Sequence, residues 1–357
     1  NSGTVIDLKT GIKESVTFQT PSGRTLLNFN TKESDTGIEI DYGMAVKRDI
    51  STGTVMEVES KDDIEILAIN DLGNVESNIH LYKYDTVHGK CKEVIKQDSE
   101  TVTIHNQKIK FLSESDPSKL PWKDLDIDLV IESTGFFTDR NSASKHLEAG
   151  AKKVLISAPA KNPDFTVVYG VNDKDLIDDH KIISNASCTT NCLAPLVYLL
   201  ENSVGLESGY MTTVHSVTGD QNTIDTIHKD LRRARNSLIS IIPTSTGAAR
   251  AVGEVLPQLK GKIDGSAIRV PTPNVSLVDF KFLSKRETNE EELIMIFKNA
   301  EKGILKSVLE TTSEPLVSPD FNQNPHSSIV DLSEIKVLNQ KFCRVLSWYD
   351  NEWGFSN

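Results

Sequence analysis

The sequence predicts an α/β protein of two domains, with an additional β-rich segment at its amino end. The chain has 357 residues, more than the roughly 250–300 residues at which a single hydrophobic core stops growing. From about residue 62, apolar runs of strand length alternate with helical stretches, a pattern typical of parallel strands buried on both faces. Residues 1 to about 60 instead contain short alternating runs separated by Gly, Ser, Pro and Asp, which is typical of hairpins.

The amino-terminal segment is predicted to form short antiparallel strands. Apolar and polar residues alternate in five short runs, at residues 5–8, 16–18, 26–29, 38–40 and 55–58. Such runs fit a half-buried pleated surface. A disordered polar tail is the alternative for this segment.

The next part of the chain is predicted to carry a parallel sheet. Its strands are Ile64–Ile69, Leu129–Ile131 and Val154–Ile156, and Ser142–Gly150 is a helical stretch. Small polar residues follow the strands: Asp71 after the first, Ser133, Thr134 and Gly135 after the second, and Ser157 after the third. Ligands bind at the carboxyl ends of strands in open α/β sheets, so these residues are predicted to line a ligand site.

The second half of the chain is predicted to begin with a helix from about Ser187 to Glu201. Strands are expected at residues 210–215, 266–269 and 276–282. A helix over Glu290–Ala300 follows Thr288, which is expected to be its N-cap.

Composition excludes several classes of protein. Lys and Arg number 39 against 51 Asp and Glu, a net charge of −12, which argues against a general nucleic-acid binder. No apolar run reaches the roughly 18–20 residues of a membrane span, and no secretory signal is recognised. The four cysteines do not have zinc-site spacing with His, so no metal site is expected. A reducing, cytoplasmic location is expected.

Cys188 is the first candidate for chemistry. It follows an apolar strand and begins an apolar helix within Ser187-Cys188-Thr189-Thr190. Unpaired N–H groups and the dipole at a helix start favour an anion, so the thiol pKa is expected to be lowered. Neighbouring hydroxyls could bind phosphate at the same terminus. The alternative is an inert buried cysteine.

A nucleophilic thiol needs a base, and His215 is the candidate. It lies at a predicted strand end, in Thr213-Val214-His215-Ser216. An imidazole there can take the thiol proton and later exchange protons with a substrate. The alternative is a structural histidine.

Candidate anion-binding groups lie downstream. Arg232, Arg233 and Arg235 precede the polar turn Pro243–Ala249, and Arg269 ends another strand. Guanidinium groups combined with hydroxyls suit phosphate. A solvated basic face is the alternative.

Five stretches of sequence together resemble phosphorylating glyceraldehyde-3-phosphate dehydrogenase. The resemblance runs from about Ile64 to Asn357, and Pro243–Ala249 fits this family better than the related erythrose-4-phosphate dehydrogenase. The stretches are Ser184-Asn-Ala-Ser-Cys-Thr-Thr-Asn-Cys-Leu-Ala-Pro195, His228-Lys-Asp-Leu-Arg-Arg-Ala-Arg235, Pro243–Ala249, Arg269-Val-Pro-Thr-Pro-Asn-Val-Ser276 and Ser347-Trp-Tyr-Asp-Asn-Glu-Trp-Gly354.

The resemblance implies a glycolytic enzyme that oxidises and phosphorylates D-glyceraldehyde 3-phosphate with NAD. Cys188 resembles the nucleophile, His215 resembles its base, and the intermediate would be a thioester that inorganic phosphate cleaves. One phosphate pocket would contain Thr218, Asp220 and Arg269. The other would contain residues of the helix start and the polar turn, namely Ser187, Thr189, Arg233, Thr246 and Gly247. The family implies a homotetramer.

For NAD, the resemblance implies that Asp71 holds the adenosine ribose and that Asn351 orients the nicotinamide amide. An acid at position 71 favours NAD because it would repel a 2′-phosphate. Thr226-Ile227 departs from the Leu-Pro that is usual in strictly NAD-dependent members.

The amino end departs from the family pattern. Met44-Ala-Val-Lys47 resembles the family's start, but Arg48–Ser60 follows where a G-x-G loop would approach the pyrophosphate. The first strand and its crossover helix, and the family's final helix, are also expected to be missing. Either the amino segment is a real β-rich replacement, or the sequence is a fragment, fusion or reading-frame artefact, which we favour.

The fold expected is therefore an incomplete Rossmann-type nucleotide domain and an α+β catalytic domain with a mixed or antiparallel sheet. The boundaries expected are 1–60 for the β-rich segment, 61–187 plus 351–357 for the nucleotide domain, and 188–350 for the catalytic domain. The alternative function is a degraded relative with impaired NAD binding that keeps a reactive thiol and anion sites.

Overall fold

A computed structural model describes residues 65–91, 95–98, 100–104 and 107–357, together with the backbone of three earlier strands. The described residues form two compact units. The first lies within Asn1–Val167, Asp175–Asn185 and Ser356–Asn357, and the second within Val168–Lys174 and Ala186–Phe355. The domain boundaries expected from the sequence stay predictions.

The first unit is built around a mixed sheet. Its helices are α1 (Val75–Lys83) and α2 (Arg140–Glu148). Its strands are β1 (Leu26–Asn28), β2 (Gly37–Glu39), β3 (Gly43–Lys47), β4 (Glu65–Asn70), β5 (Tyr84–Asp85), β6 (Gly89–Lys90), β7 (Lys96–Gln97), β8 (Thr101–Ile104), β9 (Gln107–Leu112), β10 (Leu129–Glu132), β11 (Lys153–Ile156), β12 (Phe165–Thr166) and β13 (Ile182–Ser184).

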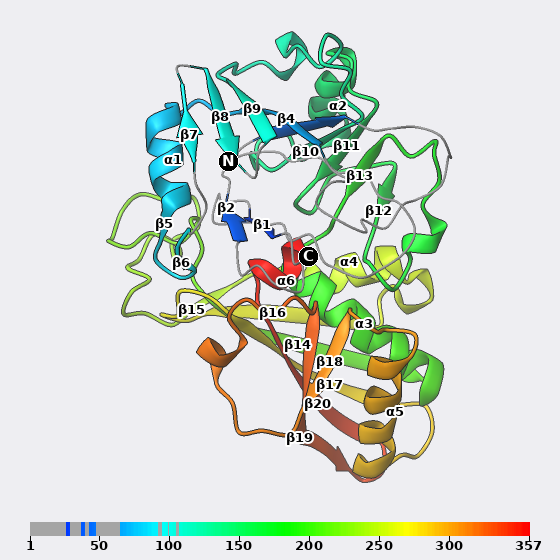
Figure 1. The fold of residues 1–357 in the computed structure, drawn as a ribbon. Helices are drawn as coiled ribbons and strands as arrows, with labels where there is room; N and C mark the ends of the chain where they lie inside the picture. Colours follow the sequence, from blue (N-terminus) through cyan, green and yellow to red (C-terminus); the bar gives the residue numbers. More distant parts are fainter. Residues whose placement is uncertain are drawn as a thin grey trace. The chain divides into compact units, whose positions relative to one another are not determined.

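The main sheet of this unit has the order β12-β13-β11-β10-β3-β4-β9-β8-β7 (Figure 1). Strands β10, β11, β13 and β12 pair in parallel, and β4 pairs in parallel with β9. The prediction of parallel strands is therefore confirmed for these runs. Strand β3 lies between β4 and β10 and is antiparallel to both. The first strand was expected to be missing, and this was wrong, because β3 occupies the place between β4 and β10. It runs in the opposite direction to both of these neighbours.

Local sequence explains where the helices of the first unit begin. The Asp139 carboxylate accepts the N–H groups of Asn141 and Ser142, at 2.9 and 3.1 Å, and so caps α2. The core beneath the sheet is apolar, and its largest fully buried side chain is Trp122.

Of the five alternating amino-terminal runs, two lie on described strands. Strands β1 and β2 pair antiparallel, with Leu26 opposite Glu39, as the hairpin prediction requires. The runs at 5–8, 16–18 and 55–58 lie outside the described residues.

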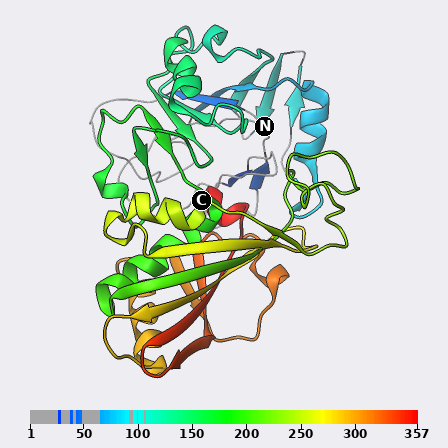
Figure 2. The ribbon, with the colours of Figure 1, turned by 180° about the vertical axis from the view of Figure 1, so that it is seen from behind.

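The second unit is a mixed sheet, of order β15-β16-β14-β17-β20-β19-β18, with helices against it (Figure 2). Strands β14 and β16, and β18 and β19, pair in parallel, and the other pairs are antiparallel. Its elements are α3 (Cys188–Ser203), β14 (Leu206–His215), β15 (Ile242–Thr244), α4 (Ala248–Val255), β16 (Ile263–Arg269), β17 (Ser276–Ser284), α5 (Glu290–Lys302), β18 (Leu309–Thr312), β19 (Ser328–Leu338), β20 (Phe342–Tyr349) and α6 (Trp353–Ser356).

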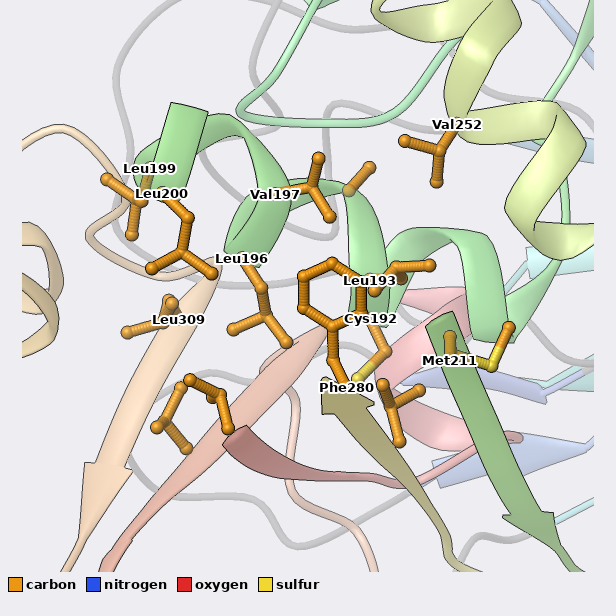
Figure 3. Close-up of a cluster of buried hydrophobic side chains, with 14 of the residues drawn as sticks. Cys192, Leu193, Leu196, Val197, Leu199, Leu200, Met211, Val252, Phe280 and Leu309 are labelled. Atoms are coloured by element: carbon orange, nitrogen blue, oxygen red, sulfur yellow. The ribbon is translucent and has the colours of Figure 1, made fainter. Parts of the chain in front are cut away.

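Helix α3 is the central element of the second core. Twelve of its residues are buried, and its apolar side chains pack over strands of the sheet, with Leu196 and Cys192 near Phe280 (Figure 3). Burying a Leu or Phe side chain contributes about 1.5–3 kcal/mol, so this packing fixes the start of α3 relative to the strand ends.

The start of helix α5 agrees with the prediction, but its N-cap does not. Helix α5 begins as predicted at Glu290, but its N-cap is Asn289, whose Oδ1 accepts the Glu292 N–H at 2.8 Å. Thr288 instead donates to the Glu292 carboxylate at 2.7 Å, so the predicted cap was one residue early.

None of the helices in the described ranges is long and apolar enough to cross a membrane.

Candidate active site

Cys188 is the first residue of α3, and the local sequence explains why the helix starts there. Ala186 has a left-handed backbone, with φ of 56°, which turns the chain sharply after β13. Ser187 then takes an extended conformation, and its Oγ accepts the Thr190 N–H at 3.1 Å. A Ser N-cap satisfies one orphan donor of the helix start, so the thiol is held at a fixed helix terminus.

His215 ends β14 and faces the thiol. The Cys188 Sγ atom lies 3.4 Å from the His215 Nε2 atom. On the other side of the ring, Nδ1 lies 2.8 Å from the Ser216 carbonyl oxygen. With the ring proton on Nδ1, donated to this carbonyl, Nε2 is free to accept the thiol proton. With the ring proton on Nε2, Nδ1 instead accepts a hydrogen bond from Arg269 Nη1, 2.7 Å away.

Arg269 joins this pair from the neighbouring strand. Strands β14 and β16 are parallel, and their register sets His215 opposite Arg269. The Arg269 Nη1 group donates to the Ser216 carbonyl at 2.8 Å and lies 2.7 Å from His215 Nδ1. A positive charge is therefore built in beside the thiol and the imidazole.

Burial dominates the electrostatics of the pair. It raises the pKa of the Cys188 thiol to about 11, while the charge of Arg269 and hydrogen bonds from Thr189 act in the opposite direction. Burial and Arg269 together hold the pKa of His215 well below its ordinary value. The expectation of a lowered thiol pKa was therefore wrong, because desolvation outweighs the helix terminus.

A buried tyrosine lies beside the pair. The Tyr349 hydroxyl is 2.9 Å from the hydroxyl of Thr189 and 2.9 Å from that of Thr213. Its ring meets the His215 ring edge-on, with centroids 5.9 Å apart. Burial raises the pKa of Tyr349 well above its ordinary value, so its hydroxyl stays neutral and links helix α3 to strand β14.

Asn351 is held in one orientation by two serines. Its Oδ1 accepts hydrogen bonds from Ser216 Oγ at 2.9 Å and from Ser276 Oγ at 2.7 Å. Ser276 Oγ also accepts the Ser216 N–H at 3.0 Å, so its own proton is available for Asn351. The amide nitrogen of Asn351 is left as a donor with no hydrogen bond to the rest of the described chain.

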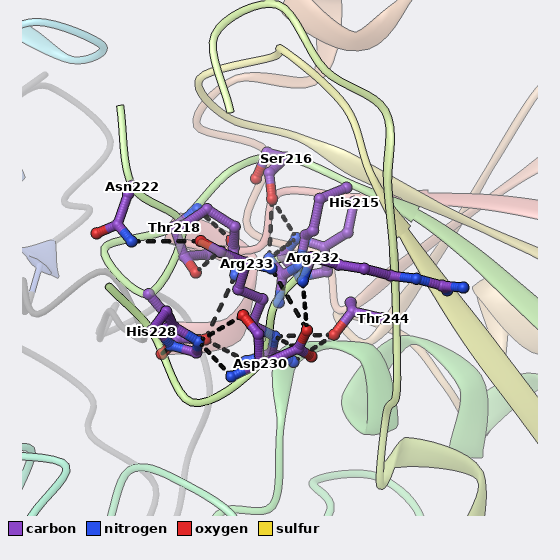
Figure 4. A network of polar contacts seen from close by, with 12 residues as sticks. His215, Ser216, Thr218, Asn222, His228, Asp230, Arg232, Arg233 and Thr244 are labelled. Atoms are coloured by element: carbon purple, nitrogen blue, oxygen red, sulfur yellow. Dashed lines mark hydrogen bonds and ion pairs between the residues drawn. The ribbon is translucent and has the colours of Figure 1, made fainter. Parts of the chain in front are cut away.

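A polar network connects the two predicted phosphate pockets (Figure 4). Arg233, predicted for one pocket, forms an ion pair with Asp220, predicted for the other. Its Nε and Nη2 groups also donate to Thr244 Oγ1, at 2.8 and 2.6 Å. Arg233 and Asp220 both influence the pKa of Arg269 electrostatically, which brings these three charges into one region.

The remaining predicted anion-binding residues are placed as follows. Thr218 donates through its N–H and its hydroxyl to Gln221 Oε1, both at 3.0 Å. Thr246 Oγ1 accepts the Ala248 N–H at 3.1 Å, and Gly247 precedes α4. Within the described ranges, Thr246 and Gly247 make no hydrogen bond to Cys188 or to His215.

The residues predicted to bind NAD, apart from Asn351, lie in the first unit. The Asp71 carboxylate follows β4 and accepts the Gly73 N–H. Ser133 and Ser157 are 8% and 7% exposed, and Gly135 has a left-handed φ of 72°. The Ser133 hydroxyl, in the loop that follows β10, is buried and has no hydrogen-bond partner within the described residues. This hydroxyl is therefore available to a ligand.

Sequence reasoning missed several members of the site. Tyr349, Ser216, Ser276 and Gln221 were not assigned, although Tyr349 lies inside the motif that ends at Gly354. That motif was the only signal for it. Among the residues that the structure describes, no group of three or more His, Cys, Asp or Glu could hold a metal ion.

Two family models match the chain. Residues 187–351 match the model described as glyceraldehyde 3-phosphate dehydrogenase, C-terminal domain. Residues 49–140 match the model described as glyceraldehyde 3-phosphate dehydrogenase, NAD binding domain.

Curated relatives give the same family. The chain is similar to a glyceraldehyde-3-phosphate dehydrogenase of Xanthobacter flavus, 54% identical over 83% of this chain and 89% of the relative. It is 56% identical to one of Zymomonas mobilis, over 82% of this chain and 88% of the relative. A glyceraldehyde-3-phosphate dehydrogenase 2 of Bacillus subtilis is 50% identical, over 83% of this chain and 87% of the relative.

Proposed function

Because the chain belongs to the glyceraldehyde-3-phosphate dehydrogenase family, we propose that it oxidises D-glyceraldehyde 3-phosphate to 1,3-bisphosphoglycerate in glycolysis. NAD and inorganic phosphate are its co-substrates. The observation that carries this proposal is the 3.4 Å approach of Cys188 Sγ to His215 Nε2. The alternative of a degraded relative has no similarity in its favour.

In the first step, His215 accepts the thiol proton of Cys188, and the sulfur adds to the aldehyde carbon. This forms a thiohemiacetal, whose oxygen takes a proton from the imidazolium. His215 then removes that proton as a hydride leaves the carbon, so that a thioester remains on Cys188. NAD supplies the hydride acceptor when it is bound. A phosphate oxygen then attacks the thioester carbon, which releases the acyl phosphate and regenerates the thiolate.

The residues of the first unit fit an NAD molecule at its adenosine end. Asp71 provides a carboxylate at the end of β4 for ribose hydroxyls, and the buried Ser133 hydroxyl has no partner in the described protein. An unused buried hydroxyl costs free energy unless a ligand completes it. We assign Thr134, Gly135 and Ser157 to the same site because they follow the carboxyl ends of β10 and β11. Asn351 would present its amide nitrogen to the nicotinamide carboxamide.

The phosphate groups are assigned to the arginine region of the second unit. Arg269, Thr218 and Asp220 form one proposed pocket. Support comes from the cluster of Arg233, Arg269 and Asp220, whose charges interact. Because Asp220 neutralises Arg233 in the protein alone, an incoming phosphate would exchange one anion for another at this guanidinium. The second pocket comprises Ser187, Thr189, Arg233, Thr246 and Gly247.

The reaction requires NAD, phosphate and Cys188. We expect aldehyde and NAD alone to yield at most about one NADH per Cys188, and continued NADH formation to require phosphate as well. Cys188→Ser should abolish both. Cys91→Ser is the matched control, because Cys91 is a half-buried cysteine of the other unit. Wild-type protein that produces no NADH at saturating NAD would refute the proposal.

We also propose that the protein assembles as a homotetramer. Large apolar side chains are exposed within 224–241, and Ile227 is 100% exposed. Large exposed apolar patches mark interaction surfaces, and these side chains gather in one short segment of the chain. The exposed members are Ile224, Ile227, Leu231, Leu238, Ile239 and Ile241.

Light scattering on size-exclusion fractions tests the assembly. Wild type should have four times the mass of one chain, and Ile227→Glu should yield smaller species. Met295→Glu is the control, because Met295 is an exposed apolar residue of α5 outside this segment. A wild-type monomer would contradict the proposal. A cytoplasmic location is proposed with it, since the free thiol of Cys188 needs a reducing compartment.

A further inference from the structure

Three buried polar side chains of the first unit are linked in a row by hydrogen bonds. Trp122, His146 and Glu132 are 0%, 4% and 2% exposed. The Trp122 Nε1 group lies 3.0 Å from His146 Nδ1, and His146 Nε2 lies 2.8 Å from Glu132 Oε2. Buried polar groups must be satisfied, and a partly satisfied network is costly.

The indole fixes which nitrogen of His146 carries the proton. An indole N–H only donates, so Nδ1 must be the acceptor. The ring proton is therefore on Nε2, which donates to Glu132. Because Nε2 is a donor, position 132 must present an acceptor to it.

The other oxygen of Glu132 holds the loop that follows β10. Glu132 Oε1 accepts the backbone N–H of Thr134 at 2.7 Å. Thr134 Oγ1 in turn accepts the Phe136 N–H at 3.0 Å, and between them Gly135 has a left-handed φ of 72°. The carboxylate thus fixes the turn in which the loop begins.

This loop contains three of the residues assigned above to NAD, namely Ser133, Thr134 and Gly135. Ser133, which has the unpartnered buried hydroxyl, lies between Glu132 and Thr134. The Phe137 ring also meets the His146 ring edge-on, with centroids 6.3 Å apart, so His146 interacts with residues on both sides of the loop. The loop geometry therefore depends on His146 although His146 is not in it.

We propose that Trp122 and His146 are positioning residues that hold Glu132 as a two-sided acceptor and thereby pre-form the NAD-binding loop at 133–135. This inference rests on the proposed function only for the identity of the ligand. The hydrogen bonds that run from Trp122 through His146 to the accepting Glu132 carboxylate exist in the protein itself.

The proton positions predict an unusual effect of Glu132→Gln. A glutamine offers one acceptor and one donor, but the site needs two acceptors, for His146 Nε2–H and for the Thr134 N–H. The introduced NH₂ group would therefore face a donor on one side. Replacing Trp122 by Phe removes the indole N–H and allows the imidazole proton to move to Nδ1. Nε2 can then accept a hydrogen bond from the introduced NH₂ group, so Trp122→Phe should partly rescue Glu132→Gln.

His146 offers a matched pair of variants. The amide of an asparagine occupies the place of Nδ1, and that of a glutamine the place of Nε2. His146→Gln keeps a donor toward Glu132, whereas His146→Asn loses it. Asp128→Asn is the control, because Asp128 is a buried carboxylate of the same unit that binds Lys152 at 2.7 Å instead of the loop.

The first measurement is NAD affinity by calorimetry on the full chain. We expect Glu132→Gln and His146→Asn to weaken NAD binding about tenfold, since a buried polar group is left unpaired. The double variant Trp122→Phe/Glu132→Gln should bind more tightly than Glu132→Gln alone. His146→Gln and Asp128→Asn should stay within about twofold of wild type.

The second measurement is hydrogen exchange of the Thr134 amide without NAD. Exchange should accelerate about tenfold in Glu132→Gln and His146→Asn, and should slow again in the double variant. Unchanged exchange, or a double variant worse than the sum of its parts, would overturn the inference. Wild-type protein that does not bind NAD, yet shows these exchange effects, would refute the proposed function and leave the positioning role standing.

Discussion

Replacing Arg269 by Gln tests how charge controls the reactive thiol. Arg269 Nη1 lies 2.7 Å from His215 Nδ1, and its charge lowers the pKa of both Cys188 and His215. A charge within about 4–6 Å shifts a pKa by roughly 1–3 units. Removing it should therefore raise the pKa of Cys188 from about 11 by at least about one unit, or ~1.4 kcal/mol.

The sign of the effect on reactivity follows from the thiolate fraction. A higher thiol pKa lowers the thiolate fraction at every pH below it, so alkylation of Cys188 should slow about tenfold at neutral pH. The curve of rate against pH should move to higher pH. His215, freed from the same charge, should become easier to protonate, because its pKa rises.

The assay is the rate of alkylation by iodoacetamide, followed on the Cys188 peptide by mass spectrometry. A neutral reagent is required because an anionic one would also lose its attraction to the arginine. Arg235→Gln is the control, since Arg235 is exposed and paired with Asp225 at 3.0 Å. Equal rate–pH curves for Arg269→Gln and wild type would refute the electrostatic reasoning.

Three further predictions concern buried polar groups. Tyr349→Phe removes the hydroxyl between Thr189 and Thr213 and should lower the free energy of unfolding in urea by about 1–3 kcal/mol. Asn351→Asp keeps the acceptor for Ser216 and Ser276 but replaces the amide donor, so NAD binding in calorimetry should weaken about tenfold. Asp350→Asn loses an acceptor for the Gln323 N–H and should cost about 1–3 kcal/mol in urea titrations. Since burial raises the Asp350 pKa above 3.8, wild type should lose stability relative to this variant as pH rises from 3.8 through the folded-state pKa.

The start of α3 and the end of β14 could be predicted because their signals are local. A Ser N-cap after an apolar strand predicts a helix start, and an alternating run that ends in polar residues predicts a strand end. Cys188 and His215 were proposed as site residues from these signals and the family motif. The N-cap of α5 was misplaced by one residue, because Thr288 and Asn289 are both capping residue types and only their backbone geometry separates them.

The thiol pKa could not be predicted, because it depends on tertiary packing. Helix α3 carries an almost continuous buried surface, and its core closes over Cys188, which is 4% exposed. Desolvation of that extent outweighs the favourable helix terminus. The contact of Tyr349 with Thr189 joins residues 160 positions apart, and no local pattern signals such a pair.

The direction of β3 could not be predicted from local sequence either. It affects the part of the first unit to which NAD binding is assigned. Because β3 is antiparallel to β4, Gly43 pairs with Asn70 at the edge where β4 ends, and Lys47 pairs with Glu65 where β4 begins. Ligands bind at the edge of the sheet where the parallel strands end. At that edge β3 begins, whereas β4 ends there. A phosphate-binding turn directly after β3 would therefore start at the opposite edge. Among the residues that the structure describes, those that follow β4, β10 and β11 lie at this edge. The loop held by Glu132 is one of these segments, so its conformation should affect NAD affinity.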